Sequence, residues 1–143
     1  LYGISMNKMF EIDMTTGDQT ALYSGFYFGV TGMMLYTMAA DDAGAIYAIS
    51  SLGALCSLDQ TTGCGAYVID KNTKLDGTSL NGSNSSMAFG SDGALYWAAT
   101  TTAKGTASTV LNKVDLETGK VSQYIGSFGG VDQDVKLTGM FIK

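Results

Sequence analysis

The side chains with the most obvious capacity for chemistry are two groups of carboxylates, Asp41 with Asp42 and Asp132 with Asp134. Ca²⁺ is held by several carboxylate and carbonyl oxygens, so these four residues are calcium candidates. Neither group has the spacing of an EF-hand loop, and turns use Asp so often that solvated turns are the stronger interpretation. A carboxylate pair could also hydrolyse glycosides, but no second catalytic motif accompanies it. We therefore predict no metal site and no catalytic residue.

The absence of histidine from all 143 residues also argues against catalysis. Histidine is the commonest general base, the usual ligand of transition metals and the side chain that titrates near neutral pH. The two cysteines alone cannot complete a closed zinc site. We expect a protein that has no cofactor and is not an enzyme.

Charge and hydropathy argue against two classes of partner. The net charge is −5 and only eight residues are Lys or Arg, without the basic cluster that a nucleic-acid site needs. Residues 19–40 carry no charge over a length that could span a bilayer. This stretch nevertheless contains Gly, Thr, Ser and Gln and divides into two strands and a loop. We therefore predict neither nucleic-acid binding nor a membrane span.

The two cysteines, Cys56 and Cys64, lie on either side of a turn that ends at Gly63. If Asp59 pairs with Cys64 across a hairpin, then Cys56 faces Tyr67 and the sulfurs are offset along the strands. That offset exceeds the usual reach of a disulfide unless the register slips. We expect free thiols, with Cys56 buried.

One phrase occurs three times, and its form is that of a β-hairpin turn. Each copy reads apolar residue, Asp, any residue, Thr or Glu, Thr, Gly. Asp at the start of a turn hydrogen-bonds forward to backbone amides, and Gly adopts positive φ without steric penalty. The copies are MFEIDMTTGDQTAL (9–22), LCSLDQTTGCGAYV (55–68) and VLNKVDLETGKVSQY (110–124), with turns at Asp13–Gly17, Asp59–Gly63 and Asp115–Gly119.

Two more phrases accompany each copy, and both read as strands because they are short, apolar and bounded by Gly and Asp. One phrase aligns Tyr2, Tyr47 and Tyr96, in LYGIS (1–5), AIYAIS (45–50) and ALYWAAT (94–100). The other aligns Met33, Met87 and Met140, in VTGMML (30–35), NSSMAF (84–89) and LTGMFI (137–142).

No segment sustains helical periodicity, so we predict an all-β protein. The phrases give four antiparallel strands per copy, named A (Met phrase), B (Tyr phrase), C (before the Asp) and D (after the Gly). Periods of about 40–50 residues with four strands each indicate the blades of a β-propeller. A single propeller unit over 1–143 would hold blades at 30–70 and 84–127 and a third blade split between 1–25 and 135–143.

The segments LYGISMNKMFEIDMTTGDQTAL and ALYWAATTTAKGTASTVLNKVDLETGKVSQYIG resemble blades of the YVTN and quinoprotein-like β-propellers, whose units carry an "LYai…L..iD..TG" signature. The resemblance covers essentially the whole chain and implies the blade type. It implies no single function, because such blades serve dehydrogenases, scaffolds and surface binding proteins alike. The quinoprotein cofactor is not implied, since no adjacent cysteines are present.

Three blades are too few for a closed ring, because propellers usually have four to eight. An arc of three blades leaves an apolar face at each end, which needs a partner. Two chains would give six blades, with residues 135–143 of one chain completing the first blade of the other. The alternative is that the chain is a fragment of a longer propeller. We expect self-association.

Ligands of propellers usually bind among the D–A and B–C loops, which here are rich in Gly, Ser, Thr and Asn. Aromatic faces beside amides and hydroxyls suit a sugar or a peptide, although the same aromatics could fold into the core between blades. The D–A loops are 24–31, 70–86 and 126–138, and the B–C loops are 5–8, 50–53 and 100–109. The candidate ligand-binding residues are Phe26, Tyr27, Phe28, Asn81, Asn84, Phe128, Asp132 and Asp134.

The sequence therefore favours a non-enzymatic binding or scaffold module that presents these loops to a glycan or protein partner. Two alternatives stay open: part of a propeller enzyme with acidic residues in the channel, and a purely structural repeat of a larger surface protein. Leu1 is not preceded by Met or by a leader, so we expect a mature form or an excised piece. The composition suggests a secreted, cell-surface or periplasmic protein.

Overall fold

The structure, a computed structural model, describes residues 1–5, 8–23, 34–51, 53–62, 65–68, 85–103 and 106–128. All regular structure in these residues is β-strand, which confirms the predicted all-β class. Within these ranges no helix exists that is long and apolar enough to cross a membrane. The uncharged stretch 19–40 contains two strands, β3 and β4, as predicted.

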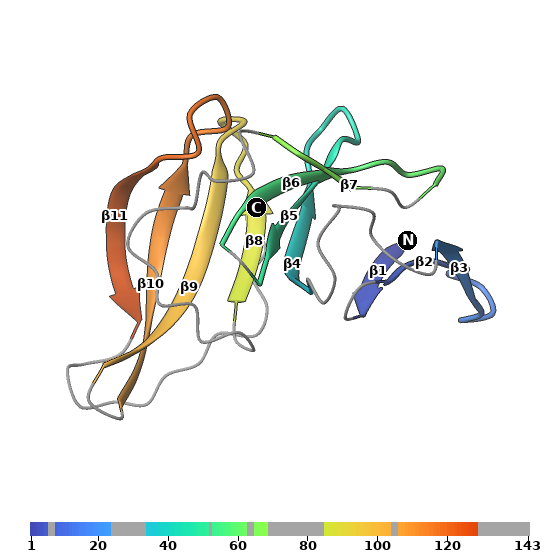
Figure 1. Cartoon of the computed structure of the whole chain (residues 1–143), viewed down its shortest axis with the longest axis horizontal. Helices are drawn as coiled ribbons and strands as arrows, with labels where there is room; N and C mark the ends of the chain where they lie inside the picture. Colours follow the sequence, from blue (N-terminus) through green and yellow to red (C-terminus); the bar gives the residue numbers. More distant parts are fainter. Residues whose placement is uncertain are drawn as a thin grey trace.

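The strands form three antiparallel sheets (Figure 1). The first sheet contains β1 (Tyr2–Ser5), β2 (Lys8–Ile12) and β3 (Gln19–Tyr23). The middle sheet contains β4 (Leu35–Ala40), β5 (Ile46–Ser50), β6 (Leu55–Leu58) and β7 (Gly65–Tyr67). The third sheet contains β8 (Ser85–Phe89), β9 (Leu95–Ala103), β10 (Thr106–Val114) and β11 (Val121–Phe128).

Each sheet is a meander in which consecutive strands are neighbours. The middle and third sheets therefore have the four antiparallel strands expected of each repeat, in the order A to D. The first sheet has strands B, C and D in β1, β2 and β3. Its predicted A strand, at 135–143, lies outside the described residues.

Two details of the predicted strands are wrong. Met38 pairs with Ala48 as Met87 pairs with Trp97, so Met38 and not Met33 is the equivalent of Met87. Met33 and Met87 were aligned because the short phrases around them are similar. Which residues are equivalent is instead determined by the residues that pair across the strands.

The second error concerns residues 100–109, which were expected to form a loop. Apart from 104–105, which are not described, these residues extend β9 and β10 as paired strands, from Thr100 opposite Thr109 to Ala103 opposite Thr106. Thr is β-branched and favours a strand over a loop, and this run contains many Thr residues. The third sheet thus carries a longer B–C hairpin than the middle sheet.

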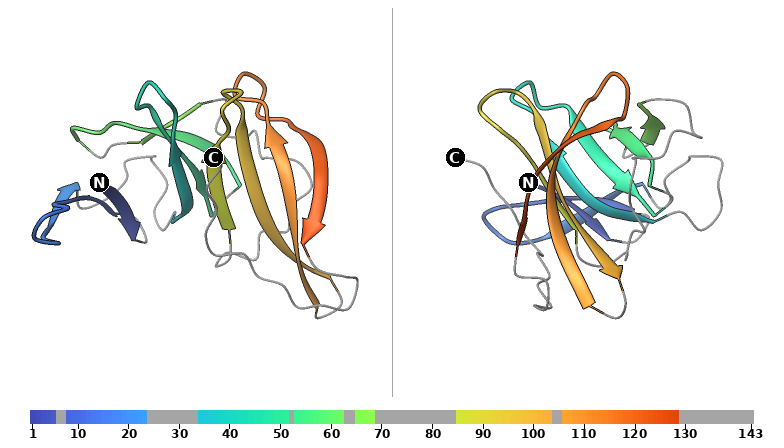
Figure 2. Two further views of the ribbon diagram at one scale, coloured as in Figure 1. Left: turned by 180° about the vertical axis from the view of Figure 1, so that it is seen from behind. Right: turned by 90° about the vertical axis from the view of Figure 1, so that its left-hand side faces the viewer.

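The three sheets lie side by side, with the middle sheet between the other two (Figures 1 and 2). The A strands β4 and β8 lie against each other, and β1 lies near β4. β1, β4 and β8, the first described strands of the three sheets, are thus neighbours, and the other strands extend away from them. This arrangement is compatible with blades placed about a common axis.

Two apolar cores hold the sheets together, one on each face of the middle sheet. Ile46 and Ala48 of β5 are buried against Met9 of the first sheet. Ile49 of the same strand points the other way and is buried against Trp97 of the third sheet. Side chains alternate between the faces of a strand, so β5 serves both cores and is apolar almost throughout.

Polar groups in the second core have hydrogen-bond partners. The Trp97 indole N–H donates to Ser85 Oγ at 2.6 Å. The buried Asn112 side chain donates to the Val110 carbonyl at 3.3 Å. Among the described residues, no buried side-chain nitrogen or oxygen lacks a partner. The core is therefore closed by specific contacts as well as by apolar packing.

Candidate functional site

The connections between strands lie at two opposite edges of the molecule. In an antiparallel meander the A–B and C–D turns lie at one edge, named here the turn edge, and the B–C and D–A connections lie at the other, named the loop edge. In the third sheet, residues 90–94 and 115–120 lie at the turn edge and the β9–β10 hairpin projects at the loop edge (Figure 1). The candidate sites divide between these two edges.

The C–D turns at the turn edge are built around aspartates that serve the backbone. Asp13 Oδ1 accepts hydrogen bonds from the N–H groups of Thr15 at 2.7 Å and Thr16 at 3.2 Å. The Gly17 N–H donates to the Asp13 carbonyl at 2.8 Å, and Gly17 adopts a φ of 78°. The side-chain contacts recur at Asp59, with Thr61 (3.0 Å) and Thr62 (2.7 Å), and at Asp115, with Glu117 (2.8 Å) and Thr118 (3.0 Å). The turn role predicted for the repeated Asp is confirmed.

These contacts stabilise the ionised carboxylates. The N–H groups of Thr15 and then Thr16 lower the pKa of Asp13 below its ordinary value of 3.8. Backbone hydrogen bonds likewise lower the pKa of Asp59, chiefly from Thr62, and the pKa of Asp115, chiefly from Thr118. A general acid needs a pKa near the working pH, so these carboxylates are poorly suited to that role.

Acid should destabilise the fold through these turns. A carboxylate whose pKa is lower in the folded state than in the unfolded state contributes stability that is complete above the unfolded value of 3.8. That contribution is lost as the pH falls below 3.8 through the folded pKa. We expect the free energy of unfolding, measured with urea between about pH 6 and pH 2, to fall in this acidic range.

A triple variant provides the control, with Asp13, Asp59 and Asp115 all changed to Asn. The amide oxygen of Asn accepts the same backbone hydrogen bonds but does not titrate in this range. Its stability should be lower at neutral pH and should fall less steeply in acid. Parallel pH curves for the two proteins would show that the turns do not carry the effect.

Asp41 and Asp42 lie in an A–B turn, and Asp41 serves that turn. The Asp41 N–H donates to the Ala45 carbonyl at 3.0 Å, and Asp41 Oδ1 accepts from the Ala45 N–H at 2.8 Å. Gly44 completes the turn with a φ of 86°. In the described part of the chain, no group of three or more Cys, Asp or Glu side chains could hold a metal ion. The turn thus accounts for Asp41 without a bound cation.

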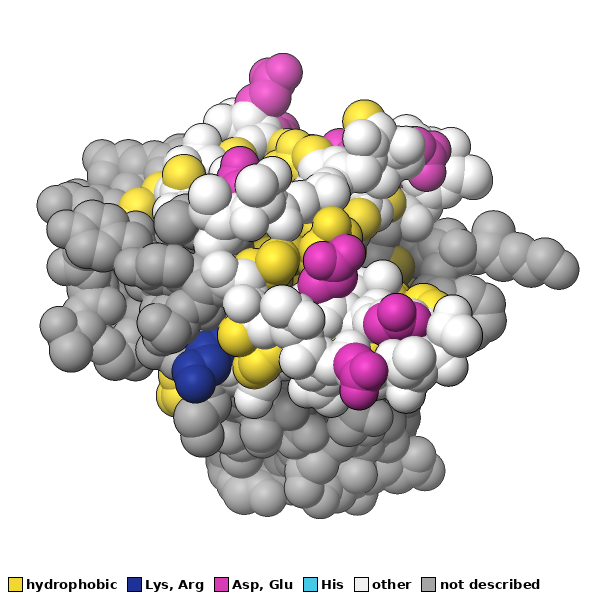
Figure 3. Space-filling model, turned by 90° about the vertical axis from the view of Figure 1, so that its right-hand side faces the viewer, with side chains coloured by type: hydrophobic (Ala, Val, Ile, Leu, Met, Phe, Trp, Pro, Cys, Tyr) yellow, Lys and Arg dark blue, Asp and Glu magenta, His cyan; other side chains and the backbone are white. Residues whose placement is uncertain are grey.

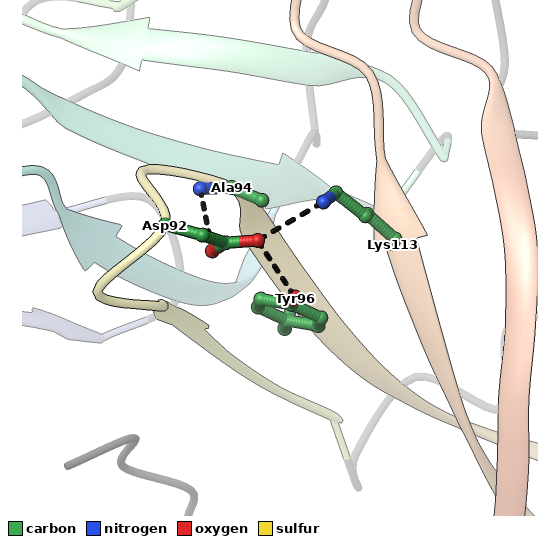
Figure 4. Close-up of polar contacts among 4 residues, drawn as sticks. All are labelled: Asp92, Ala94, Tyr96 and Lys113. Atoms are coloured by element: carbon green, nitrogen blue, oxygen red, sulfur yellow. Dashed lines mark hydrogen bonds and ion pairs between the residues drawn. The ribbon is translucent and has the colours of Figure 1, made fainter.

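A polar cluster at the second A–B turn was not recognised in the sequence (Figure 4). Asp92 Oδ2 forms an ion pair with Lys113 Nζ at 3.0 Å and accepts a hydrogen bond from the Tyr96 hydroxyl at 3.0 Å. Asp92 Oδ1 accepts from the Ala94 N–H at 3.1 Å, and Lys113 Nζ lies 5.7 Å from the Tyr96 ring centroid. The cluster joins the turn to the side-chain surfaces of β9 and β10.

The charges of this cluster satisfy each other. The hydrogen bond from Lys113 is the main cause of a lowered pKa at Asp92, and the same bond raises the pKa of Lys113. The side chains are 48% and 39% exposed, so the pair lies in water and adds little stability. A paired, solvated carboxylate and ammonium are suited to positioning a turn rather than to proton transfer.

Two adjacent hollows lie beside this cluster, one between the two turns of the third sheet and the other between turns of the middle and third sheets. One has a volume of about 320 Å³ and is lined by residues 93–95 and 113–116. The other has a volume of about 210 Å³ and is lined by residues 41–43, 89–90, Gly93 and Leu116. Carboxylates at the rims and the apolar Leu116 would suit the end of a cationic side chain.

The described charges of the turn edge are mainly acidic. Acidic side chains, with apolar ones between them, are also spread over the side of the molecule formed by the first sheet (Figure 3). The acidic residues in turns are Asp13, Asp18, Asp41, Asp42, Asp59, Asp92, Asp115 and Glu117. The described lysines are Lys8, Lys113 and Lys120. The described part of this surface would repel polyanions, and the expected lack of a nucleic-acid partner stays a prediction.

Of the candidate ligand-binding residues, the structure describes only Phe128, which lies in a strand that ends at the loop edge. Phe128 is the last residue of β11, and its backbone pairs with Thr109 near the projecting β9–β10 hairpin. The other candidates lie outside the described residues; they are Phe26, Tyr27, Phe28, Asn81, Asn84, Asp132 and Asp134. Asp132 and Asp134 are also the remaining calcium candidates. The binding role of this edge stays a prediction.

Cys56 is a free, fully buried thiol in β6. It pairs with Tyr67 of β7, which confirms the register predicted from the turn. Burial raises its pKa to about 12, so the reactive thiolate is scarce at neutral pH. Cys56 is therefore a packing residue of the first core.

Comparisons with known proteins give no match: no protein-family model and no curated protein resembles the sequence closely enough to be significant.

Proposed function

We propose that the chain forms part of a β-propeller and acts as a non-enzymatic binding or scaffold module. The observation that carries the proposal is the repeated four-stranded meander, packed face to face with its A strands β4 and β8 adjacent. Propellers combine these features, since each blade packs on the next and places its first strand nearest the axis. The resemblance to YVTN and quinoprotein-like blades supports the same architecture.

The loop edge is the proposed binding edge, and the partner is a glycan or a protein. At the opposite edge the repeated aspartates are engaged by backbone N–H groups, and Asp92 is paired with Lys113. These contacts give the turn edge a structural role. The loop edge carries the extended β9–β10 hairpin, whose sequence is rich in Thr and Ser.

Secretion or display at a cell surface or in the periplasm fits this module. The chain has few lysines, and its connections are rich in Ser, Thr, Gly and Asn. Glycans and surface proteins are the partners available in those compartments. We place the protein there as part of the proposal.

A glycan array and a panel of chromogenic glycosides, used in parallel, test this function. We expect the purified chain to bind at least one glycan or surface protein and to turn over no glycoside. Phe128→Ala should weaken binding, whereas Met14→Ala should not, because Met14 lies 74% exposed at the β2–β3 turn on the opposite edge. Turnover that disappears in an Asp132→Asn, Asp134→Asn double variant would favour the enzyme alternative.

A further inference from the structure

The smaller of the two hollows at the turn edge lies where three turns meet. Residues 41–43 come from the A–B turn of the middle sheet, residues 89–90 and Gly93 from the A–B turn of the third sheet, and Leu116 from its C–D turn. The volume of about 210 Å³ holds several water molecules. Gly93 and Leu116 also line the larger hollow beside it. The space is therefore sufficient for the end of a side chain from another molecule.

The walls of the smaller hollow are largely apolar, and its middle is unobstructed. Phe89 and Leu116 are half-buried and pack against the second core, which holds both side chains in place. Gly93 lies between them with a φ of 74°, and a Cβ atom at this position would meet no atom of a more distant residue within 4 Å. An aliphatic stem could thus pack on these walls without displacing a side chain of the chain itself.

The charge at this hollow is negative and is not neutralised by a described lysine. Asp41 and Asp42 are the only charged residues that line it. Asp41 Oδ1 accepts a hydrogen bond from the Ala45 N–H, whereas the exposed Asp42 carboxylate has no hydrogen bond or ion pair in the structure. Lys113 lines only the larger hollow, and its ammonium group is paired with Asp92 (Figure 4). Asp42 is therefore available to a cation from outside.

Apolar walls below a rim of carboxylates are complementary to the side chain of arginine. Its aliphatic stem packs on apolar surface while its charged end stays at the rim. The planar guanidinium donates to carboxylates through two parallel hydrogen bonds and also packs on aromatic rings, which suits a hollow lined by Asp42 and Phe89. The ammonium group of lysine is compact and strongly hydrated, so it gains less from the same walls.

We propose that the smaller hollow binds an arginine side chain that a partner protein presents to the turn edge. This site lies on the opposite edge from the loops and goes beyond the binding role proposed for them. The occupant is an arginine within a protein segment rather than the free amino acid, because the rim carboxylates would repel a free α-carboxylate. The repeated aspartates keep their role in the turns, since the carboxylate that receives the guanidinium is that of Asp42.

Titration of the purified chain, followed by the NMR signals of its backbone amides, tests the site. The probe is acetyl-arginine amide, and its matched control is acetyl-citrulline amide, which has nearly the same shape but no charge. We expect the arginine probe to shift the amide signals of Asp42, Gly93 and Leu116. The citrulline probe should bind at least about 10-fold more weakly, because it forms no charge-assisted hydrogen bonds. Free arginine should also bind more weakly than its blocked amide.

Two variants that each remove one exposed carboxylate from the turn edge separate the hollow from the general charge of the surface. Asp42 lines the smaller hollow, whereas Glu117 lines neither hollow. Asp42→Asn should weaken binding of the arginine probe by at least about 5-fold, and Glu117→Gln should change it by less than about twofold. Amide spectra without the probe should match the wild type outside the substituted turn, because Asp42 makes no contact that holds the fold.

Unshifted amides at Asp42, Gly93 and Leu116 would overturn the proposal, and so would equal binding of the arginine and citrulline probes. Equal weakening by the two variants would overturn it as well, since binding would then follow the overall charge. Tighter binding of free arginine than of its amide would exclude a protein segment as the occupant.

The outcome is independent of the function proposed for the loop edge. Asp42→Asn should leave binding on the glycan array unchanged, and Phe128→Ala should leave binding of the arginine probe unchanged. A chain that binds the probe but nothing on the array would count against the loop-edge function alone. A chain that binds a glycan but not the probe would count against the arginine site alone.

Discussion

Replacing Trp97 with alanine is expected to lower the free energy of unfolding by about 3–5 kcal/mol. Trp97 is the largest fully buried side chain of the described chain and lies at the centre of the core between the middle and third sheets. Its removal leaves a cavity among Ile49, Met87 and Leu95 that the surrounding strands fill only in part. It also removes the donor to Ser85 Oγ.

Trp97→Phe is the matched control, because it keeps an aromatic ring in the core but removes the indole N–H. We expect it to cost clearly less than the alanine variant, since most of the buried volume remains. The chain has a single Trp, so urea unfolding should be followed by far-ultraviolet circular dichroism rather than by fluorescence. A loss below about 1 kcal/mol for Trp97→Ala would mean that the two sheets are not packed as described.

The turns were predictable from the sequence because their chemistry is local. Asp13, Asp59 and Asp115 each bond to N–H groups two and three residues later, so a short phrase contains the whole interaction. The C–D register follows from counting outward from such a turn, and the pairing of Cys56 with Tyr67 is correct for that reason.

The A strands were harder to place, because their turn signal is weaker. Residues 41–45 and 90–94 form turns of one type, with Gly44 and Gly93 at φ of 86° and 74°. Gly44 and Gly93 are each followed by Ala, an apolar residue and Tyr. An alignment based on this shared sequence would have matched Met38 with Met87. The alignment of Met33 with Met87 instead relied on the similar composition of two short phrases. Composition does not determine which residues pair across adjacent strands.

The cluster of Asp92, Tyr96 and Lys113 depends on pairing across the β9–β10 hairpin. Tyr96 stands opposite Lys113 only because the two strands meet at residues 103–106. Propensity predicts strands there but not the position of the hairpin tip, and one residue of slip would turn Lys113 to the other face. The sequence likewise did not show which face of each strand packs in which core, because this depends on contacts between sheets.

Replacing Met9 with alanine is expected to release the first sheet from the rest of the molecule, at a cost of about 2–5 kcal/mol. Of the described side chains in this sheet, Met9 alone is buried, and it packs in the first core with Leu35, Ile46 and Ala48. Three short strands without a covered face are marginal by themselves. The sheet should therefore open as a local unit while the third sheet stays folded.

Hydrogen exchange tests this directly. Amides of β1, β2 and β3 should lose protection in Met9→Ala, and amides of β9 and β10 should keep it. Met14→Ala removes the same type of side chain from the β2–β3 turn, at a 74% exposed position, and should change stability by less than about 0.5 kcal/mol. Equal loss of protection in all three sheets would show a single cooperative unit instead.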